Sequence, residues 1–182
     1  MSIYSINAVL LNQNAYIDLV NDKDSKLKFV SMHNEGILSS KPVFKCQEGL
    51  NFTNILDTDM YGCTSSLLVF SKKFYNEMHQ TLKKEMSFFE ADLIIEGKTD
   101  TCYVGKITNT QDILNEEKSE YDDWLGDEEC FVEKPIFKKY ILSTNYCVKN
   151  YSEHPIEVFI ENFKRITQLS NLKLTFKNLK QA

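Results

Sequence analysis

The sequence predicts an α+β fold, with a mostly antiparallel sheet and two strand–helix–strand pseudo-repeats. Two matching segments carry this prediction: Val69 to Phe74 reads Val-Phe-Ser-Lys-Lys-Phe, and Val158 to Phe163 reads Val-Phe-Ile-Glu-Asn-Phe. Each segment follows apolar residues and precedes a helical stretch and a second apolar run. The chain also contains twelve Phe and nine Tyr, a composition that favours packing in sheets.

The residues before the first copy contain short strand candidates separated by turn residues. They are Ile3–Leu10, Lys26–Val30 and Pro42–Cys46. Residues 47–64 look irregular and are expected to run in an extended path over the core.

The first copy begins with a short apolar strand, Leu67–Phe70. Ser71 stands where a helix N-cap belongs, because its hydroxyl can accept a bond from an orphan backbone N–H. Phe74, Met78 and Leu82 then recur at helical spacing and predict one apolar helix face, with Tyr75 beside it. A strand over Phe88–Ile95, a turn at 96–98 and a strand over Thr101–Ile107 complete a hairpin.

The second copy is expected at the C-terminal end. Its elements are a strand over Ile156–Ile160, a helix over Glu161–Leu169 and a strand over Leu172–Lys177. Strands are also expected from Cys130 and over Tyr146–Lys149, and 136–142 fits either a strand or a helix. The chain is interpreted as a single domain, 1–182, that can divide into an N-terminal lobe (1–107) and a C-terminal lobe (130–182) joined by an acidic segment (108–129).

Charge is distributed unevenly along the chain. The net charge of −5 argues against a general nucleic-acid binder, which needs Lys and Arg to neutralise phosphates. Residues 1–129 hold twelve Lys and twenty-two acidic residues, a net of −10, whereas 130–182 hold eight Lys, Arg165 and four acidic residues, a net of +5. Either the two halves present ordinary solvated faces, or an acidic surface steers a basic partner.

Cysteine usage and the N-terminal sequence indicate the cytoplasm. Five Cys lie far apart with no Cys-x-x-Cys pair, which fits free thiols in a reducing compartment. The first residues lack the pattern of a signal peptide, and no apolar run is long enough to span a bilayer. We therefore expect a cytoplasmic protein with no disulfide and no membrane partner.

No motif indicates catalysis, a metal or a cofactor. His33, His79 and His154 have no second ligand at a metal-binding spacing, and none of the six Gly lies in a phosphate-binding loop. No Cys occurs in a nucleophile signature, although a Cys–His pair can be assembled in space, with Cys63 or Cys102 as candidates. We expect no catalytic residues, no metal site and no cofactor.

The acidic segment is the strongest candidate for partner binding. Nine acidic residues occur in 112–129 against Lys118 alone, and Ile113 and Leu114 are compatible with a short helix there. Aromatic side chains inside a ring of carboxylates suit an interface, because aromatics carry much of the binding energy and charge selects the partner. The alternatives are a solvated loop, or a Trp124 packed beneath it. The predicted contact residues are Glu120, Tyr121, Asp122, Asp123, Trp124, Asp127 and Glu128.

The order of these pieces resembles a family of bacterial polymorphic-toxin immunity proteins, the group first described from a myxobacterial protein and long called a domain of unknown function. The likeness lies in Ile3-Tyr-Ser-Ile-Asn-Ala, Leu68–Phe74 with the hairpin through Tyr103, Asp112–Tyr121, and Ile156–Phe163 through Phe176. The chain departs from the pattern at Ser170-Asn171, where a Gly-containing turn is expected, and at Ile160, which replaces a polar cap.

The resemblance implies a non-enzymatic protein that binds and neutralises the C-terminal domain of a cognate toxin by steric capture, without a nucleic-acid partner. It supplies no catalytic residues. Two alternatives from other classes remain open at this point: a small enzyme with a spatially assembled Cys/His site, and an acidic anti-defence protein that mimics nucleic acid.

Overall fold

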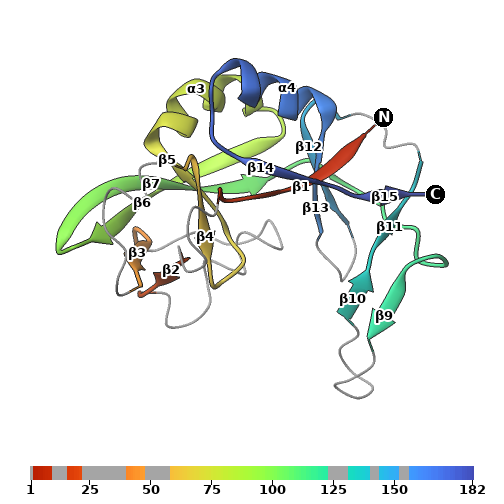
Figure 1. Ribbon diagram of the computed structural model, residues 1–182, viewed down its shortest axis with the longest axis horizontal. Helices are drawn as coiled ribbons and strands as arrows, with labels where there is room; N and C mark the ends of the chain where they lie inside the picture. Colours follow the sequence, from red (N-terminus) through yellow and green to blue (C-terminus); the bar gives the residue numbers. More distant parts are fainter. Residues whose placement is uncertain are drawn as a thin grey trace.

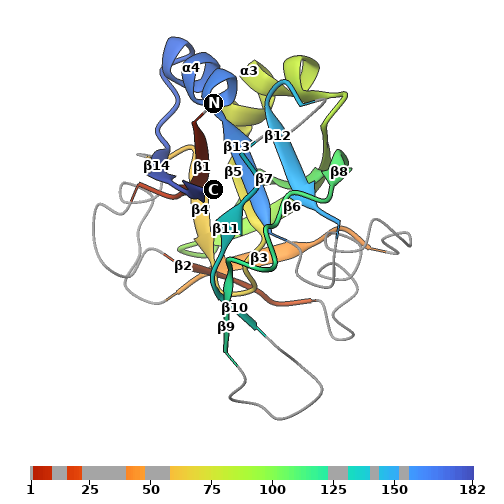
Figure 2. The same cartoon turned by 90° about the vertical axis from the view of Figure 1, so that its right-hand side faces the viewer.

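The computed structural model describes residues 2–9, 16–21, 40–47, 58–122, 131–139, 144–151 and 156–182. Strands dominate these residues, and the two helices found among them lie side by side on one side of the molecule (Figures 1 and 2). The predicted combination of strands and helices is therefore confirmed, and the sheets are mixed, with both antiparallel and parallel pairs.

Six strands close into a barrel in the order β2–β3–β6–β7–β5–β4. Their bounds are β2 Tyr16–Leu19, β3 Val43–Cys46, β4 Met60–Cys63, β5 Leu68–Ser71, β6 Met86–Ile95 and β7 Lys98–Ile107. Apolar side chains such as Phe44, Val69 and Val104 fill its interior. The β2–β4 and β3–β6 pairs are parallel, so closure depends on partners far apart in sequence. Alternating patterns identify strands but not such partners, and the sequence did not predict the barrel.

A five-stranded sheet has the order β14–β1–β13–β12–β8. Its strands are β1 Ile3–Asn7, β8 Thr110–Gln111, β12 Cys147–Asn150, β13 Glu157–Ile160 and β14 Thr175–Asn178. Two small sheets pair β9 (Glu120–Asp122) with β10 (Phe131–Lys134), and β11 (Ile136–Phe137) with β15 (Lys180–Gln181). Because β1 pairs with β13 and β14, the five-stranded sheet crosses the boundary expected between the two lobes. The division into lobes stays a prediction.

The two matching segments occupy equivalent elements. β5 leads into helix α3 (Lys72–Leu82) and then β6, and β13 leads into helix α4 (Glu161–Leu169) and then β14. The two strands of each unit lie on either side of a third strand and pair antiparallel with it. This third strand is β7 for the first unit and β1 for the second. The units thus share their element order and their strand arrangement, and their superposition in space stays a prediction.

Local chemistry explains both the likeness and its departures. The Ser71 hydroxyl accepts the backbone N–H of Phe74 at 3.0 Å and caps α3 as predicted. Helix α4 has no side-chain cap, because Ile160 is buried in an apolar cluster. Asn171 has φ 51° after α4 and takes the left-handed conformation that a glycine was expected to supply. Glu96 and Gly97, at φ 48° and 74°, form the predicted hairpin turn.

Both units contribute to one apolar core beneath the helices. Phe74, Met78 and Leu82 are the buried residues of α3, as their spacing predicted. Phe74 stacks on Phe70 with ring centroids 4.0 Å apart and meets Phe163 of α4 at 6.3 Å. This core joins the outer face of the barrel to the five-stranded sheet.

Several local predictions need correction. Ile113 and Leu114 do not begin a helix; they are buried against Phe137 and Val148, because apolar packing on the sheet outweighs local helix preference. Residues 60–63, expected to be irregular, form β4 in the barrel. The region 136–142 contains a strand, β11, in its described part. Lys26–Val30 and Cys130 lie outside the described residues.

Two buried carboxylates accept hydrogen bonds that link the first strand–helix unit to the C-terminal half of the chain. Glu85 accepts the backbone N–H groups of Asn145, Tyr146 and Cys147 at 2.6–2.9 Å. Asp59 accepts the Ser71 hydroxyl at 2.7 Å and the backbone N–H of Lys173 at 2.8 Å. Each carboxylate thus joins the first strand–helix unit to the C-terminal half of the chain.

Candidate partner-binding site

Three of the predicted contact residues lie on a hairpin that projects from the body. Strands β9 and β10 point away from the helices and the barrel in both ribbon views (Figures 1 and 2). Glu120, Tyr121 and Asp122 form β9. Asp123, Trp124, Asp127 and Glu128 lie outside the described residues, so their contacts stay predictions. The sequence places them in the connection between the two strands.

The base of this hairpin is fixed to the five-stranded sheet. The buried Asn150 of β12 accepts the backbone N–H groups of Ile113 and Leu114 at 3.0 and 3.2 Å through its side-chain oxygen. Leu114 then bridges to Phe137, which is fully buried. The Asn150 side-chain oxygen thus satisfies two buried N–H groups that water does not reach.

The next residues extend this attachment toward β9. Asn115 donates its N–H to the carbonyl of Ile136 at 2.8 Å. The Ser119 hydroxyl donates to the carbonyl of Asn115 and accepts the N–H of Ile136, at 2.8 and 3.0 Å. Lys138 also pairs with Asp112 at 2.7 Å. Hydrogen bonds and an ion pair therefore attach the connection to the 136–138 segment as far as Ser119.

Within the hairpin, β9 and β10 pair in an antiparallel register with one irregularity. Tyr121 lies opposite Val132 and Asp122 opposite Phe131, and the register shifts between Val132 and Lys134. Such a bulge increases the local twist and aims the outer part of a hairpin. Val132 packs against the apolar cluster that contains Phe137, so the base of the hairpin contacts the core.

The electrostatics of the hairpin are partly balanced at its base. Glu120 pairs with Lys134, and both side chains are more than half exposed. The hydrogen bond to Glu120 raises the pKa of Lys134. Beyond this pair, residues 122–129 contain five acidic residues and no basic residue. In the sequence, concentrated negative charge therefore occupies the connection between β9 and β10.

Sequence reasoning missed the hairpin itself and much of what holds it. The region 108–129 was interpreted as a joining segment, whereas 110–122 includes two strands and two buried side chains. Strand-forming residues on both sides of the acidic stretch, Tyr121 before it and Phe131 after it, were the available signal. Nothing in the sequence pointed to the acceptor role of Asn150, because that role depends on distant backbone.

The cysteines named for a spatially assembled enzyme site have different surroundings. Cys102 is fully buried inside the barrel, and burial raises its pKa to about 12. Cys63 is half-buried on β4, and burial raises its pKa as well. A high pKa disfavours the thiolate that nucleophilic catalysis requires. His79 lies on α3, where Nδ1 meets the Tyr75 carbonyl oxygen at 2.8 Å and the ring stacks on Tyr75.

The described residues hold no cluster of metal ligands, and their cysteines are free. Across the described ranges, no three His, Cys, Asp or Glu side chains gather closely enough to hold a metal ion. The cysteines Cys46, Cys63, Cys102 and Cys147 carry free thiols, and Cys130 lies outside the described residues. No described helix has the length and apolar character needed to cross a membrane.

Comparison with known proteins adds no relative. No protein-family model matches the chain, and no curated protein matches it.

Proposed function

We propose that this chain is an immunity protein, which binds the C-terminal domain of a cognate polymorphic toxin and neutralises it by steric capture. The observation that carries the proposal is the projecting hairpin of β9 and β10, held to the sheet through Asn150 and Ser119. The sequence between its two strands is acidic. The resemblance in the order of sequence segments supports the same function.

The shape and the charge of the hairpin suit this task together. A hairpin whose base is already hydrogen-bonded to the sheet loses less conformational entropy on binding than an unattached segment would. Carboxylates at its far end attract a basic surface and raise the rate of encounter. Toxins that act on nucleic acid or nucleotides need basic clefts, so an acidic projection that enters such a cleft would block substrate access. The target chemistry is therefore a basic, concave protein surface.

The experiment pairs this chain with the C-terminal domain encoded by the adjacent upstream open reading frame. Production of that domain alone should stop growth of a host cell, and co-production of this chain should restore growth. The two purified proteins should also form a stable complex that excludes the toxin's substrate. A chain with normal folding that neither restores growth nor binds this domain would contradict the proposal.

A matched variant locates the contact. Replacement of Asp122, Asp123, Asp127 and Glu128 by Asn or Gln should weaken neutralisation. A control with the same charge change, in which Glu77, Glu90, Glu96 and Asp100 are replaced, should leave neutralisation intact. All four control residues are exposed and lie away from β9 and β10. Equal loss in both variants would show that net charge acts, and not the hairpin.

A further inference from the structure

Strand β14 forms an edge of the five-stranded sheet. The sheet order places β14 outside β1, and within the described ranges β1 is its only strand neighbour. Three of its four residues are exposed and Phe176 is half-buried. An edge strand presents unpaired backbone groups, which are a template for one more strand.

The register shows which groups of β14 face outward. The N–H of Leu179 donates to the carbonyl of Ile3 at 3.0 Å. Because hydrogen-bonded and non-hydrogen-bonded pairs alternate along antiparallel strands, Lys177 and Thr175 also bond inward to β1. The N–H and C=O groups of Phe176 and Asn178 therefore point away from the sheet. Their spacing matches the hydrogen-bonding repeat of an incoming strand.

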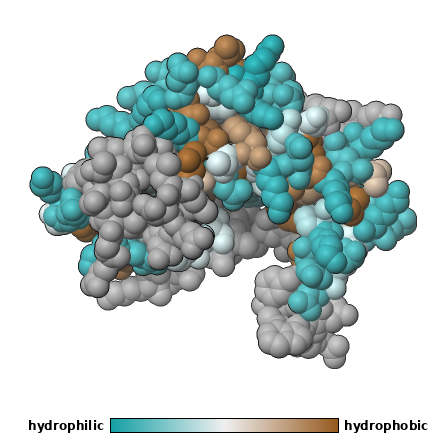
Figure 3. Space-filling model, viewed as in Figure 1, coloured by the Kyte–Doolittle hydropathy of each residue, from teal (hydrophilic) through white to brown (hydrophobic). Residues whose placement is uncertain are grey.

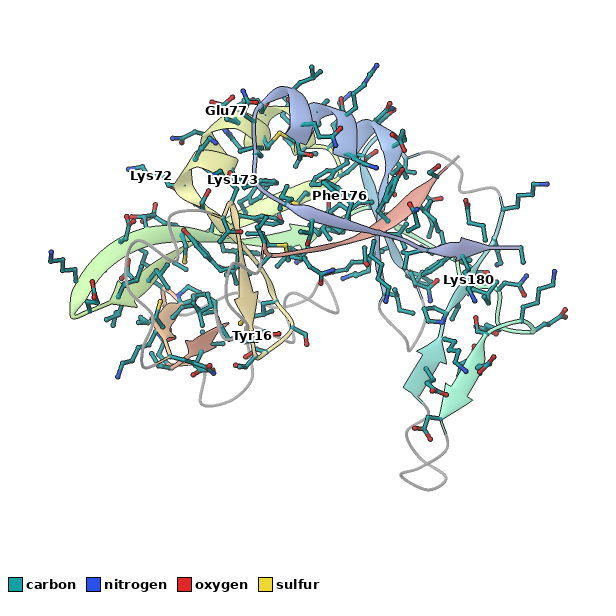
Figure 4. All side chains as sticks on the ribbon, in the orientation of Figure 1. Tyr16, Lys72, Glu77, Lys173, Phe176 and Lys180 are labelled. Atoms are coloured by element: carbon teal, nitrogen blue, oxygen red, sulfur yellow. The ribbon has the colours of Figure 1, made fainter. Side chains whose placement is uncertain are left out.

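The C-terminal segment that contains β14 is basic in an acidic protein. Residues 162–182 contain Lys164, Arg165, Lys173, Lys177 and Lys180 and no acidic residue, whereas the whole chain has a net charge of −5. In the described part of the chain, no ion pair forms at Lys164, Lys177 or Lys180. Lys173, Phe176 and Lys180 follow one another along this segment (Figure 4).

An apolar contact lies beside these cations. The ring of Phe176 meets Tyr4 edge-on at 5.8 Å, and Nζ of Lys164 lies 5.9 Å from the Phe176 ring centre and 4.5 Å from that of Tyr4. Leu174 is half-buried against the same core. Figure 3 shows hydrophobic surface below the helices with hydrophilic residues around it. An aromatic ring beside a cation offers an incoming strand both an apolar contact and a charge partner.

We propose that the outer edge of β14 is a docking site for an extended, acidic segment of a partner protein. The segment adds as a strand to Phe176 and Asn178. The carboxylates on one of its faces pair with Lys177, and Lys164, over the Phe176 ring on the opposite face, adds to the attraction. Main-chain bonds give such a complex its affinity, and side chains give it specificity. This inference goes beyond the proposed function, because it concerns a different surface with the opposite charge. A nucleic acid would use the cations but not the outward N–H and C=O groups.

The probe is a synthetic peptide that alternates glutamate with valine. Its binding to the full chain should protect the amides of Phe176 and Asn178 from hydrogen exchange, while the amide of Lys177, already bonded to β1, stays unchanged. The same peptide with N-methylated backbone nitrogens on its pairing edge should bind about tenfold more weakly or worse, because it loses strand donors. A peptide that alternates lysine with valine should not bind.

Two protein variants complete the test. Asn178→Pro removes an outward N–H and leaves the bonds to β1, so it should abolish peptide binding while Asn178→Ala retains it. Lys164→Glu with Lys177→Glu should weaken binding about tenfold or more. No binding of the acidic peptide, equal binding by Asn178→Pro and Asn178→Ala, or tighter binding of single-stranded DNA than of the peptide would each overturn the proposal.

Discussion

Gly105 illustrates how one residue fixes the packing under α3. An added Cβ there would lie 2.6 Å from Cε2 of Phe70 and 3.3 Å from the sulfur of Met86. Phe70 is fully buried and stacked on Phe74, so it has no room to withdraw. The absence of a side chain at Gly105 is what lets the Phe70 ring lie across β7.

Gly105→Ala should therefore lower the free energy of unfolding by about 1–3 kcal/mol, the usual cost of overpacking a core. Urea unfolding measures the change, and Thr99→Ala, at an exposed position of the same strand, should be nearly neutral. In the double variant Gly105→Ala, Phe70→Leu, the loss of free energy of unfolding should be smaller than the sum of the losses in the two single variants. Strict additivity of the two substitutions would show that this close approach does not matter.

Glu157 is a second residue with a measurable consequence. It lies opposite Lys149 across β12 and β13, with Cys147 and Lys106 nearby. Burial raises the pKa of Glu157 to about 7, and the charge of Lys149 opposes this shift. The folded state thus holds this proton more tightly than the unfolded state does. Its contribution to stability is present at low pH and is lost as pH rises toward 7.

Glu157→Gln should remove this pH dependence. Relative to the variant, the wild-type protein should lose free energy of unfolding between about pH 4.5 and 7 and change little above that range. Urea unfolding at a series of pH values measures the difference. Glu133→Gln, at an exposed position, serves as the control. If the free energy of unfolding depends on pH in the same way for wild type and Glu157→Gln, the pKa of Glu157 is not raised in the folded state.

At the scale of elements, the two strand–helix–strand units show what local sequence determines. Helix α4 has the predicted bounds, and the buried face of α3 follows its apolar spacing. These features depend on neighbours three or four residues away, which a sequence displays directly. The sequence also shows that Ile160 cannot cap α4. It does not show why an apolar residue stands there, because Ile160 packs against Ile113 and Val148 of other segments.

Ser71→Ala tests the cap that the sequence did predict. The hydroxyl accepts the N–H of Phe74 and donates to Asp59, so its loss affects the start of α3 and the contact to the C-terminal half. The free energy of unfolding should fall by about 1–2 kcal/mol, as for other helix caps. Asn76→Ala, at an exposed position on α3, should change it by less than about 0.5 kcal/mol. Equal effects of the two substitutions would mean that the cap adds nothing.

At the scale of the whole molecule, the structure depends on contacts that sequence patterns do not show. The barrel closes through parallel pairs, and β1 completes a sheet whose other strands lie more than a hundred residues later. The candidate site divides in the same way. Its acidic and aromatic composition is visible in the sequence, whereas the pairing of β9 with β10 and the anchor at Asn150 are not.

The two surfaces that emerge have opposite charge and lie on different elements. Acidic residues connect the two strands of the hairpin in the sequence, and the β14 segment carries lysines beside outward backbone groups. Such separation allows one chain to contact a basic cleft and an acidic segment at once. Substitutions at one surface should therefore leave binding at the other unchanged, which keeps the two proposals independently testable.

The most direct test of the central claim is the association rate with the cognate toxin domain, measured as a function of salt. Replacement of Asp122, Asp123, Asp127 and Glu128 by Asn or Gln should slow association and flatten its salt dependence, because steering acts over about 8 Å at physiological ionic strength. In the same measurement, Trp124→Ala should speed dissociation and cost about 2 kcal/mol or more of binding free energy. Unchanged association and dissociation rates for both folded variants would contradict capture by the hairpin.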